Sequence, residues 1–147
     1  MKFTVYLSGE IHTDWRKEIQ EGVNQNNLRI DFIAPIIDHE ASDSAGDHLG
    51  LEKNPFWRDH KSAKVNAIRT KSLIKRSDLA IVRFGEKYKQ WGIAYEAGLC
   101  AALGIPYVTL HSKDIIHPLK EVDSTAMAWA TTTAQVVEIL KYVIKPT

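Results

Sequence analysis

The sequence is poor in cysteine, since Cys100 is the only one among its 147 residues. A single cysteine cannot form an intramolecular disulfide. The first residues, MKFTVYLSG, have the pattern of a strand and not that of a charged leader followed by an apolar segment. We therefore expect a cytoplasmic protein in a reducing setting and not a secreted one.

Long hydrophobic runs and a strong net charge are also missing. The stretch with the fewest charges, residues 91–110, is interrupted by three glycines, a proline and a glutamate, so we do not expect it to span a membrane. Nineteen basic residues against eighteen acidic ones give a net charge of +1. A nucleic-acid polymer or a membrane is therefore not an expected partner, and an anionic ligand must be bound locally.

The common nucleotide-binding and hydrolase motifs do not occur. Neither G-x-G-x-x-G nor G-x-x-x-x-G-K-S/T is present, which argues against a dinucleotide oxidoreductase and a P-loop protein. There is no Ser-His-Asp set with an elbow motif. Cys100 lies one turn after Glu96 in an apolar segment, where a small core residue is expected.

Residues 38–48, DHEASDSAGDH, concentrate acids and histidines, but they match neither H-E-x-x-H nor an EF-hand loop. We predict no metal site there. The segment is interpreted as a lid or pocket wall, with His39, Asp43 or Asp47 as polar contacts. His12 follows the first strand and is interpreted as a helix-capping or surface residue.

The composition is typical of a soluble globular protein, with 44% apolar and 25% charged residues. A chain of about 150 residues buries roughly 68–70% of the surface that it exposes when unfolded, so one core needs no disulfide or metal. We expect residues 1–147 to form a single domain.

The hydrophobic pattern predicts five strands and four main helices. The strands are expected over residues 3–8, 28–36, 79–84, 106–110 and 126–131. The helices are expected from residue 13 or 14 to 24–27 and over 56–76, 92–103 and 134–143, with a polar loop over 38–55. In the second helix, Val65, Ile68 and either Leu73 or Ile74 are predicted to share one apolar side.

Because strands alternate with helices, each helix should be a crossover between parallel strands. We therefore predict an α/β three-layer sandwich, flavodoxin-like or Rossmann-like, with a mostly parallel five-stranded sheet in the order 2-1-3-4-5. In such sheets ligands bind beyond the carboxyl ends of the strands, where the strand order reverses. Residues 8–13 and 84–92 are the loops that reach this place.

Glu96 is the only charged residue between Trp91 and Leu110. A carboxylate in an apolar helix is costly unless it is used or satisfied, while a place near the start of a helix favours its ionised form. Small neighbours would let this helix lie close to the sheet; they are Ala94, Ala97, Gly98, Ala101 and Ala102. Two interpretations remain open: a catalytic carboxylate, or a structural one hydrogen-bonded to the backbone or a neighbouring side chain.

The charges are spread unevenly along the chain. Residues 38–53 contain five acids and one base, and residues 57–76 contain seven bases and one acid. One interpretation is a solvated helix face whose charges partly pair with the acidic segment. The other is a local positive field for a small molecule that carries a phosphate.

Three segments together carry a resemblance: YLSG at 6–9, SDLAIV at 77–82 and WGIAYEAGLCAALGIP at 91–106. They resemble the nucleoside 2-deoxyribosyltransferase-like superfamily, and YLSGEIHTDWR at 6–16 is similar to its YtoQ branch. The segment from Gly92 to Gly98 also resembles the related nucleoside 5′-monophosphate N-glycosidases. The resemblance implies that Glu96 is the nucleophile, that Tyr6, Ser8 and Gly9 line the base and sugar pocket, and that homo-oligomers form.

Two positions depart from the family pattern. Gln90 stands where the transferases place an aspartate that holds the sugar, and Thr70, between Arg69 and Lys71, stands where relatives carry an acid that handles the leaving base. Both changes remove an acid, which leaves the source of the proton for the base open. Gln90 can still bind a hydroxyl or phosphate, and Arg69 or Arg83 can bind an anion.

The leading hypothesis is an enzyme that transfers or hydrolyses at the N-glycosidic bond of a nucleoside or nucleotide, with Glu96 as nucleophile and with no metal or redox cofactor. The alternative is an inactive module that binds nucleotides or other small molecules in the same pocket. A third hypothesis, a protein-interaction domain, rests on Trp57, Trp91 and Trp129. The expected substrate-binding residues are Tyr6, Ser8, Gly9, Arg69, Thr70, Gln90 and Gly92.

Overall fold

The computed structural model describes residues 2–87 and 90–145. Its five strands form one parallel sheet in the order β2-β1-β3-β4-β5, which confirms the predicted topology. The strands are β1 (Phe3–Gly9), β2 (Ile30–Ile33), β3 (Leu79–Arg83), β4 (Tyr107–Leu110) and β5 (Ala128–Ala130). Of the predicted runs, 28–36 was the least accurate, because only its middle pairs with β1.

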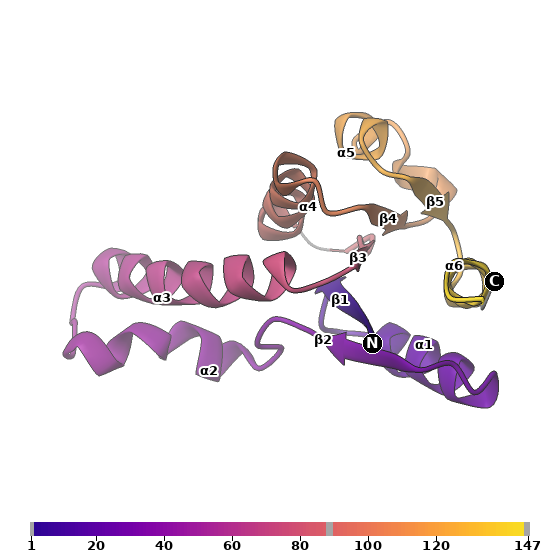
Figure 1. Ribbon diagram of the computed structural model, residues 1–147. Coiled ribbons are helices and arrows are strands. Elements are labelled where there is room, and N and C mark those ends of the chain that lie inside the picture. Colours follow the sequence, from indigo (N-terminus) through magenta and orange to yellow (C-terminus); the bar gives the residue numbers. More distant parts are fainter. Residues whose placement is uncertain (1, 88–89, 146–147) are drawn as a thin grey trace.

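Four long helices cover the two faces of the sheet: α1 (Trp15–Gln25) and α6 (Thr133–Val143) lie on one face, α3 (Pro55–Lys75) and α4 (Trp91–Leu103) on the other (Figure 1). The short elements are α2 (His39–Asp43), α5 (Lys120–Ser124) and the 3₁₀ helices η1 (Ala45–Leu49) and η2 (Lys113–Ile115). Residues 39–49, which belong to the predicted polar loop over 38–55, are therefore largely helical.

Alternation along β1 divides the core into two parts. Val5 and Leu7 face the α1–α6 side, where they pack with Trp15, Ile19 and Val23 as the spacing of that helix predicts. Tyr6 packs in the other core cluster, on the α3–α4 side. Since side chains two apart share a face, Ser8 points to this side as well. The polar residues of β1 are thus directed toward α4.

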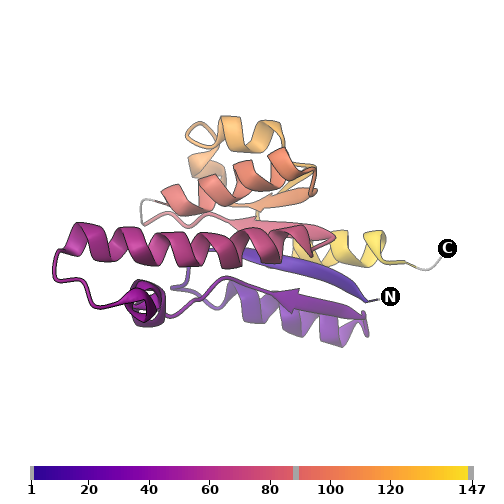
Figure 2. The same ribbon diagram turned by 60° about the vertical axis from the view of Figure 1, so that its left-hand side comes forward.

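Helix α3, with 21 residues and a length of about 30 Å, is longer than β1, whose seven residues span about 23 Å. Figure 2 shows its N-terminal half extending past the strands, with α2 alongside. Buried Ser62 joins the two segments: its hydroxyl donates to the Asp43 carbonyl at 2.6 Å and accepts from the Gly46 amide at 3.0 Å. A Cβ at Gly46 would lie 2.6 Å from the Lys61 Cβ, so the backbones approach closely.

The predicted apolar side of α3 is wrong at Ile68, whose side chain is 73% exposed, whereas Leu73 and Ile74 are buried. The inner face of this half of α3 is polar and is formed by Ser62 and Asn66, and Ile68 lies two residues beyond Asn66, on the opposite side of the helix. The polar contacts to residues 42–46 therefore decide which face is buried.

The prediction that small residues bring helix α4 close to the sheet is also wrong in part. Ala97 and Cys100 face the core, but Gly98, Ala101 and Ala102 are exposed and do not bring the helix closer to the sheet. The helix ends as predicted at Gly104, which has a φ of 70°, a conformation that favours glycine. Glu96 is the sixth residue of α4, because the helix begins at Trp91, one residue earlier than predicted.

Candidate active site

Glu96 reaches from α4 to the carboxyl-terminal half of β1. Its Oε2 accepts hydrogen bonds from the Ser8 hydroxyl at 2.5 Å and from the Tyr6 hydroxyl at 3.1 Å. Among the described residues, none donates a hydrogen bond to Oε1. The geometry shows the hydrogen bonds to neighbouring side chains that the structural interpretation expected, whereas a catalytic role of Glu96 stays a prediction.

Burial raises the pKa of Glu96 above the ordinary value of 4.5, while the hydrogen bonds from Ser8 and Tyr6 and the charge of Arg16 act in the opposite direction. Burial is also the main reason why the pKa of Tyr6 is raised, and the Glu96 carboxylate adds to the effect. The Tyr6 hydroxyl therefore stays protonated and remains a hydrogen-bond donor to Glu96.

A cavity of about 590 Å³ lies beside Glu96. Residues 8–12 and parts of the segments 35–42, 66–70 and 90–96 line it. Ligand sites for small molecules typically measure about 300–1,000 Å³, so this cavity has room for a nucleoside-sized molecule. Its lining residues include those that follow the ends of β1 and β2 and those at the start of α4, so it lies at the edge predicted from the reversal of strand order.

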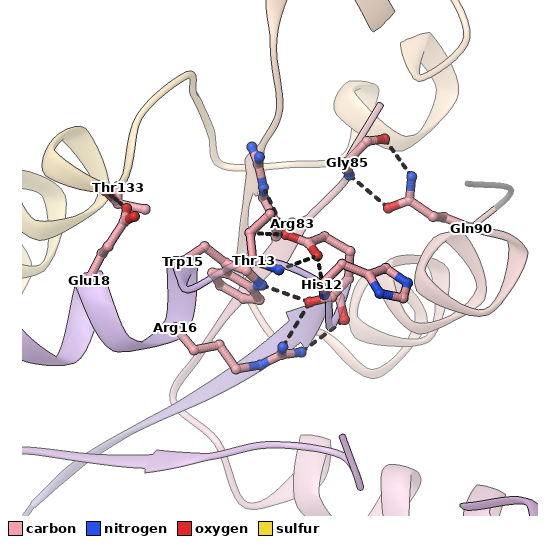
Figure 3. A network of polar contacts seen from close by, with 11 residues as sticks. His12, Thr13, Trp15, Arg16, Glu18, Arg83, Gly85, Gln90 and Thr133 are labelled. Atoms are coloured by element: carbon pink, nitrogen blue, oxygen red, sulfur yellow. Dashed lines mark hydrogen bonds and ion pairs between the residues drawn. The ribbon is translucent and has the colours of Figure 1, made fainter. Parts of the chain in front are cut away.

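The turn after β1 is held by a buried carboxylate. Glu10 accepts hydrogen bonds from the His12 amide at 2.6 Å, the Thr13 amide at 3.1 Å and the Thr13 hydroxyl. Burial alone would raise the pKa of Glu10, but these hydrogen bonds and the positive charge of Arg83 lower it overall. Glu10 is therefore ionised and fixes the backbone of residues 12 and 13 (Figure 3).

Arg16 holds the end of β1 from the α1 side. Its guanidinium donates to the carbonyls of Glu10 at 2.8 Å, Gly9 at 2.9 Å and Leu7 at 3.3 Å, and it lies over the Trp15 ring (Figure 3). Close packing adds a further constraint, because a Cβ at Gly9 would lie 2.6 Å from the Arg83 Cβ. The edge of the cavity that carries Ser8 is thus rigidly supported.

Seven of the eight residues singled out in the sequence line this cavity: Ser8, Gly9, Arg69, Thr70, Gln90, Gly92 and Glu96. Tyr6 lies behind the cavity wall, fully buried, and reaches it only through Glu96. A hydrogen bond with Thr70 lowers the Tyr6 pKa, so this threonine is close to the phenol.

The carboxamide of Gln90 has a structural contact that the sequence did not predict. Its Oε1 accepts from the Gly85 amide at 2.8 Å, and its Nε2 donates to the Gly85 carbonyl at 2.5 Å (Figure 3). The side chain therefore closes the loop before α4. Residues 88 and 89 of the predicted 84–92 loop lie outside the described residues.

Arg83 does not line the main cavity. It borders a second cavity of about 330 Å³, which shares Glu10 and His12 with the first. Its Nε is 3.9 Å from a Glu10 oxygen. Of the two arginines considered as anion ligands, Arg69 is therefore the one beside Glu96.

Residues 38–48 form one wall of the main cavity, through Asp38, His39 and Ser42. Asp38 caps α2 by accepting from the Ala41 amide at 3.1 Å. Asp43 and Asp47 do not line the cavity, and Asp47 forms an ion pair with Arg58 at 3.1 Å, as the charge-pairing interpretation expected. Within residues 2–87 and 90–145, no group of three or more His, Cys, Asp and Glu side chains is placed to hold a metal ion.

Sequence reasoning missed Glu10 and Arg16. The available signal was position: Glu10 directly follows the first strand, and Arg16 lies in the first turn of the helix that comes next. Neither lies in an apolar context that would mark it. Their roles depend on the fold, because Arg16 binds carbonyls that only the end of β1 presents.

Comparison with solved structures defines the class of fold. The chain is similar to a conserved protein from Enterococcus faecalis V583, with a TM-score of 0.67, 15% identity and coverage of 97% of this chain and 99% of that one. It is also similar to a 2-deoxyribosyltransferase from Bacillus psychrosaccharolyticus, with a TM-score of 0.59, 18% identity and 98% of both chains covered. A de novo designed Rossmann 2x3 protein matches with a TM-score of 0.53 and 14% identity over 97% of this chain and 90% of that one.

Comparison of sequences defines the family. The model of a family described as nucleoside 2-deoxyribosyltransferase YtoQ matches residues 6–144. The chain is 38% identical over 146 residues to the uncharacterized protein YtoQ of Bacillus subtilis (strain 168), covering 99% of each. The chain therefore belongs to the YtoQ nucleoside 2-deoxyribosyltransferase family. In the described part of the chain, no helix is both long enough and apolar enough to cross a membrane.

Proposed function

We propose that this protein breaks the N-glycosidic bond of a nucleoside or nucleotide and passes the sugar to a second base, or to water. The observation that carries the proposal is the arrangement of Glu96: Oε2 is held by Ser8 and Tyr6, and Oε1 accepts no hydrogen bond from the described residues beside a cavity of about 590 Å³. Membership of a nucleoside 2-deoxyribosyltransferase family supports the same chemistry.

The reaction has two steps. In the first, Oε1 of Glu96 attacks the anomeric carbon C1′, a C1′–O bond forms, and the C1′–N bond breaks with its electron pair leaving on the base. In the second, a nitrogen of the acceptor base, or a water oxygen, attacks C1′ and the electron pair returns to the carboxylate. Ser8 and Tyr6 orient the carboxylate throughout, which keeps it close to the reactive geometry.

The ionised form of Glu96 is the nucleophile, and the surroundings balance its charge. Burial makes the carboxylate more basic, while the two hydrogen-bond donors and the charge of Arg16 favour its ionised form. A nucleophile benefits from this combination, because a more basic oxygen is more reactive when it is still deprotonated.

The test is release of free base from a panel of nucleosides and 5′-monophosphates, with and without acceptor bases. We expect base release by the parent and a loss of at least about 10³-fold in Glu96→Gln, an isosteric change that keeps both hydrogen bonds. Glu138→Gln is the matched control, since this exposed glutamate on α6 forms an ion pair with Lys141 and does not line the cavity beside Glu96. Base release at parental rates by Glu96→Gln would refute the proposal.

One observation favours a second candidate, a module that binds the nucleotide without turnover. Gln90 and Thr70 replace the two family acids, and the Gln90 carboxamide is already hydrogen-bonded to Gly85. Under this alternative a nucleotide raises the melting temperature by mass action while no base appears. The same panel separates the two candidates.

We also propose that the protein forms a homo-oligomer through the outer face of α4. Trp91 is 76% exposed and Tyr95 64% exposed, and Gly98, Ala101 and Ala102 continue the same exposed surface. A helix without a charge on its outer surface is normally covered. Sedimentation should give a dimer or larger, and Ala102→Arg should shift it toward monomer.

We also propose a cytoplasmic location, which the lone, buried Cys100 supports.

A further inference from the structure

Departure of a nucleobase requires a proton as well as a nucleophile, because most bases are poor leaving groups as anions. The family acid expected for this step is replaced by Thr70, which cannot supply a proton near neutral pH. The following inference rests on the proposed function and identifies the group that takes over this role.

The titratable residues that line the cavity are Glu10, His12, Asp38, His39, Arg69 and Glu96. Four of these six can be eliminated as the acid. Glu96 is the nucleophile. The Glu10 carboxylate accepts three hydrogen bonds from residues 12 and 13, which lower its pKa and keep it without a proton. Arg69 does not release its proton in proteins.

Asp38 is engaged as the cap of α2, where its carboxylate oxygen accepts from the Ala41 amide. The remaining groups are the imidazoles of His12 and His39, whose ring centroids are 6.0 Å apart. Imidazole is the side chain that most readily holds and releases a proton near neutral pH. Elimination therefore leaves two histidines, which come from different loops.

His12 is the better supported of the two. Its backbone amide donates to Glu10 at 2.6 Å, and Glu10 also fixes Thr13 and lies 3.9 Å from Arg83 Nε. His39, by contrast, begins the five-residue helix α2 beyond the edge of the sheet. In Figure 3 the His12 ring points away from the side chains of Trp15 and Arg16, which hold the strand end from behind.

The charged groups around His12 come from two cavities. On the Glu96 side are Glu10, Asp38, His39 and Arg69, and on the other side, in the second cavity, are Arg83, Glu86 and Lys87 together with Glu10. His12 therefore lies between acidic and basic side chains on both sides.

We propose that His12 is the general acid that protonates the departing base, with Glu10 as the residue that positions it. As the C1′–N bond breaks, the proton of the His12 imidazolium moves to the base, which leaves neutral, and the ring becomes neutral. In the second step the neutral ring accepts the proton that the attacking base or water loses, and the imidazolium is restored.

The experiment compares His12→Gln, His39→Gln and His60→Gln on two substrates. The first is a purine deoxynucleoside that the parent cleaves, and the second is its N7-methyl derivative, whose base leaves neutral without a proton. His60 is the matched control, because it packs against Phe56 and Trp57 outside the cavity. We expect His12→Gln to lose about 10²–10⁴-fold on the first substrate and less than about tenfold on the second.

The pH profile gives an independent result. In the parent, the alkaline limb of kcat/KM for the first substrate reports loss of the acid's proton, and His12→Gln should lack this limb while His39→Gln keeps it. Equal losses on both substrates, or a larger loss in His39→Gln, would overturn the assignment of His12. A parent that releases base from no nucleoside or nucleotide of the panel would overturn the proposed function itself, and this inference with it.

Discussion

The cavity beside Glu96 has two walls that are built in different ways. The strand wall, residues 8–12, is continuous with the central strand of the sheet and is held by Arg16 and by the Glu10 carboxylate. The helical wall, residues 38–49, lies beyond the sheet and is joined to α3 by Ser62, Asn66 and the ion pair of Asp47 with Arg58. Both walls line one cavity, but only the strand wall is continuous with the sheet.

This difference separates two tasks. Groups that need a fixed geometry come from β1 and the turn after it: Ser8 and Tyr6, which hold the proposed nucleophile, and His12, the proposed acid. The helical wall rests on a few polar contacts to an outlying part of α3, so it can open at lower cost than the strand wall. We infer that chemistry depends on the strand wall and that substrate binding depends more on the helical wall.

The largest effect on stability is expected for Arg16→Met. The change removes three hydrogen bonds to carbonyls of Leu7, Gly9 and Glu10 and leaves these groups partly buried without their donor. We expect a loss of about 3 kcal/mol in the free energy of unfolding and a fall in Tm of about 6–12 °C. Thermal unfolding checks this, with the exposed neighbour Lys17→Met as control.

A loss in Lys17→Met as large as in Arg16→Met would show that the strand wall does not depend on the guanidinium contacts. Retention of the parental Tm by Arg16→Met would remove the contrast between the walls.

Ser62→Ala tests the helical wall and should have a smaller effect. It leaves the Gly46 amide without its acceptor and the Asp43 carbonyl without its donor, at a cost of about 1–3 kcal/mol. Because residues 38–49 then open more readily, KM should rise by more than kcat falls. Ser72→Ala, an exposed serine on the same helix, is the control. A fall in kcat alone would contradict the division of tasks.

The smallest effect is a shift in pH dependence. Since burial raises the pKa of Glu96, the acid limb of kcat/KM should lie above pH 4.5. Ser8→Ala removes a hydrogen bond that lowers this pKa, so its acid limb should move to higher pH, whereas Ser62→Ala should leave the limb in place. A limb that moves to lower pH in Ser8→Ala would contradict this account of the charge.

The raised pKa of Glu96 also predicts how the stability of the fold changes with pH. In the folded state the pKa of Glu96 is raised, so ionisation of this group costs stability as the pH rises through its titration range. Glu96→Gln removes that cost, and above this range the variant should unfold at a Tm equal to or above that of the parent. Such a gain is common when a catalytic charge is removed from a partly buried site.

Much of the fold could be predicted from the sequence because most strands are short apolar runs that end at glycine or polar residues. The run LAIVR of β3 is buried at four of its five positions, and Gly104 ends α4 as predicted. The helices α2 and η1 could not be predicted in this way, because Ser62 and Asn66 hold them by hydrogen bonds and no apolar period marks them. Exposure of Ile68 has the same cause.

The candidate site was predicted in part. Glu96 was found because it is the only charge in α4, and its placement beside Ser8 follows from the parallel order of β1, β3 and β4. The hydrogen bonds between the Gln90 side chain and the Gly85 backbone could not be predicted, since a carboxamide can bind a ligand or the backbone of a loop equally well. Glu10 and Arg16 act on backbone groups of the strand end, whose positions only the folded chain determines.

The central claim is that Oε1 of Glu96 bonds covalently to the sugar. It is tested most directly by mixing the protein with a 2-fluoro-substituted deoxynucleoside, which slows the second step, and measuring the mass of the peptide that carries residues 91–103. The account predicts one sugar-sized adduct on Glu96 in the parent and none in Glu96→Gln. Steady release of base by the parent without an adduct, or an adduct on another residue, would contradict it.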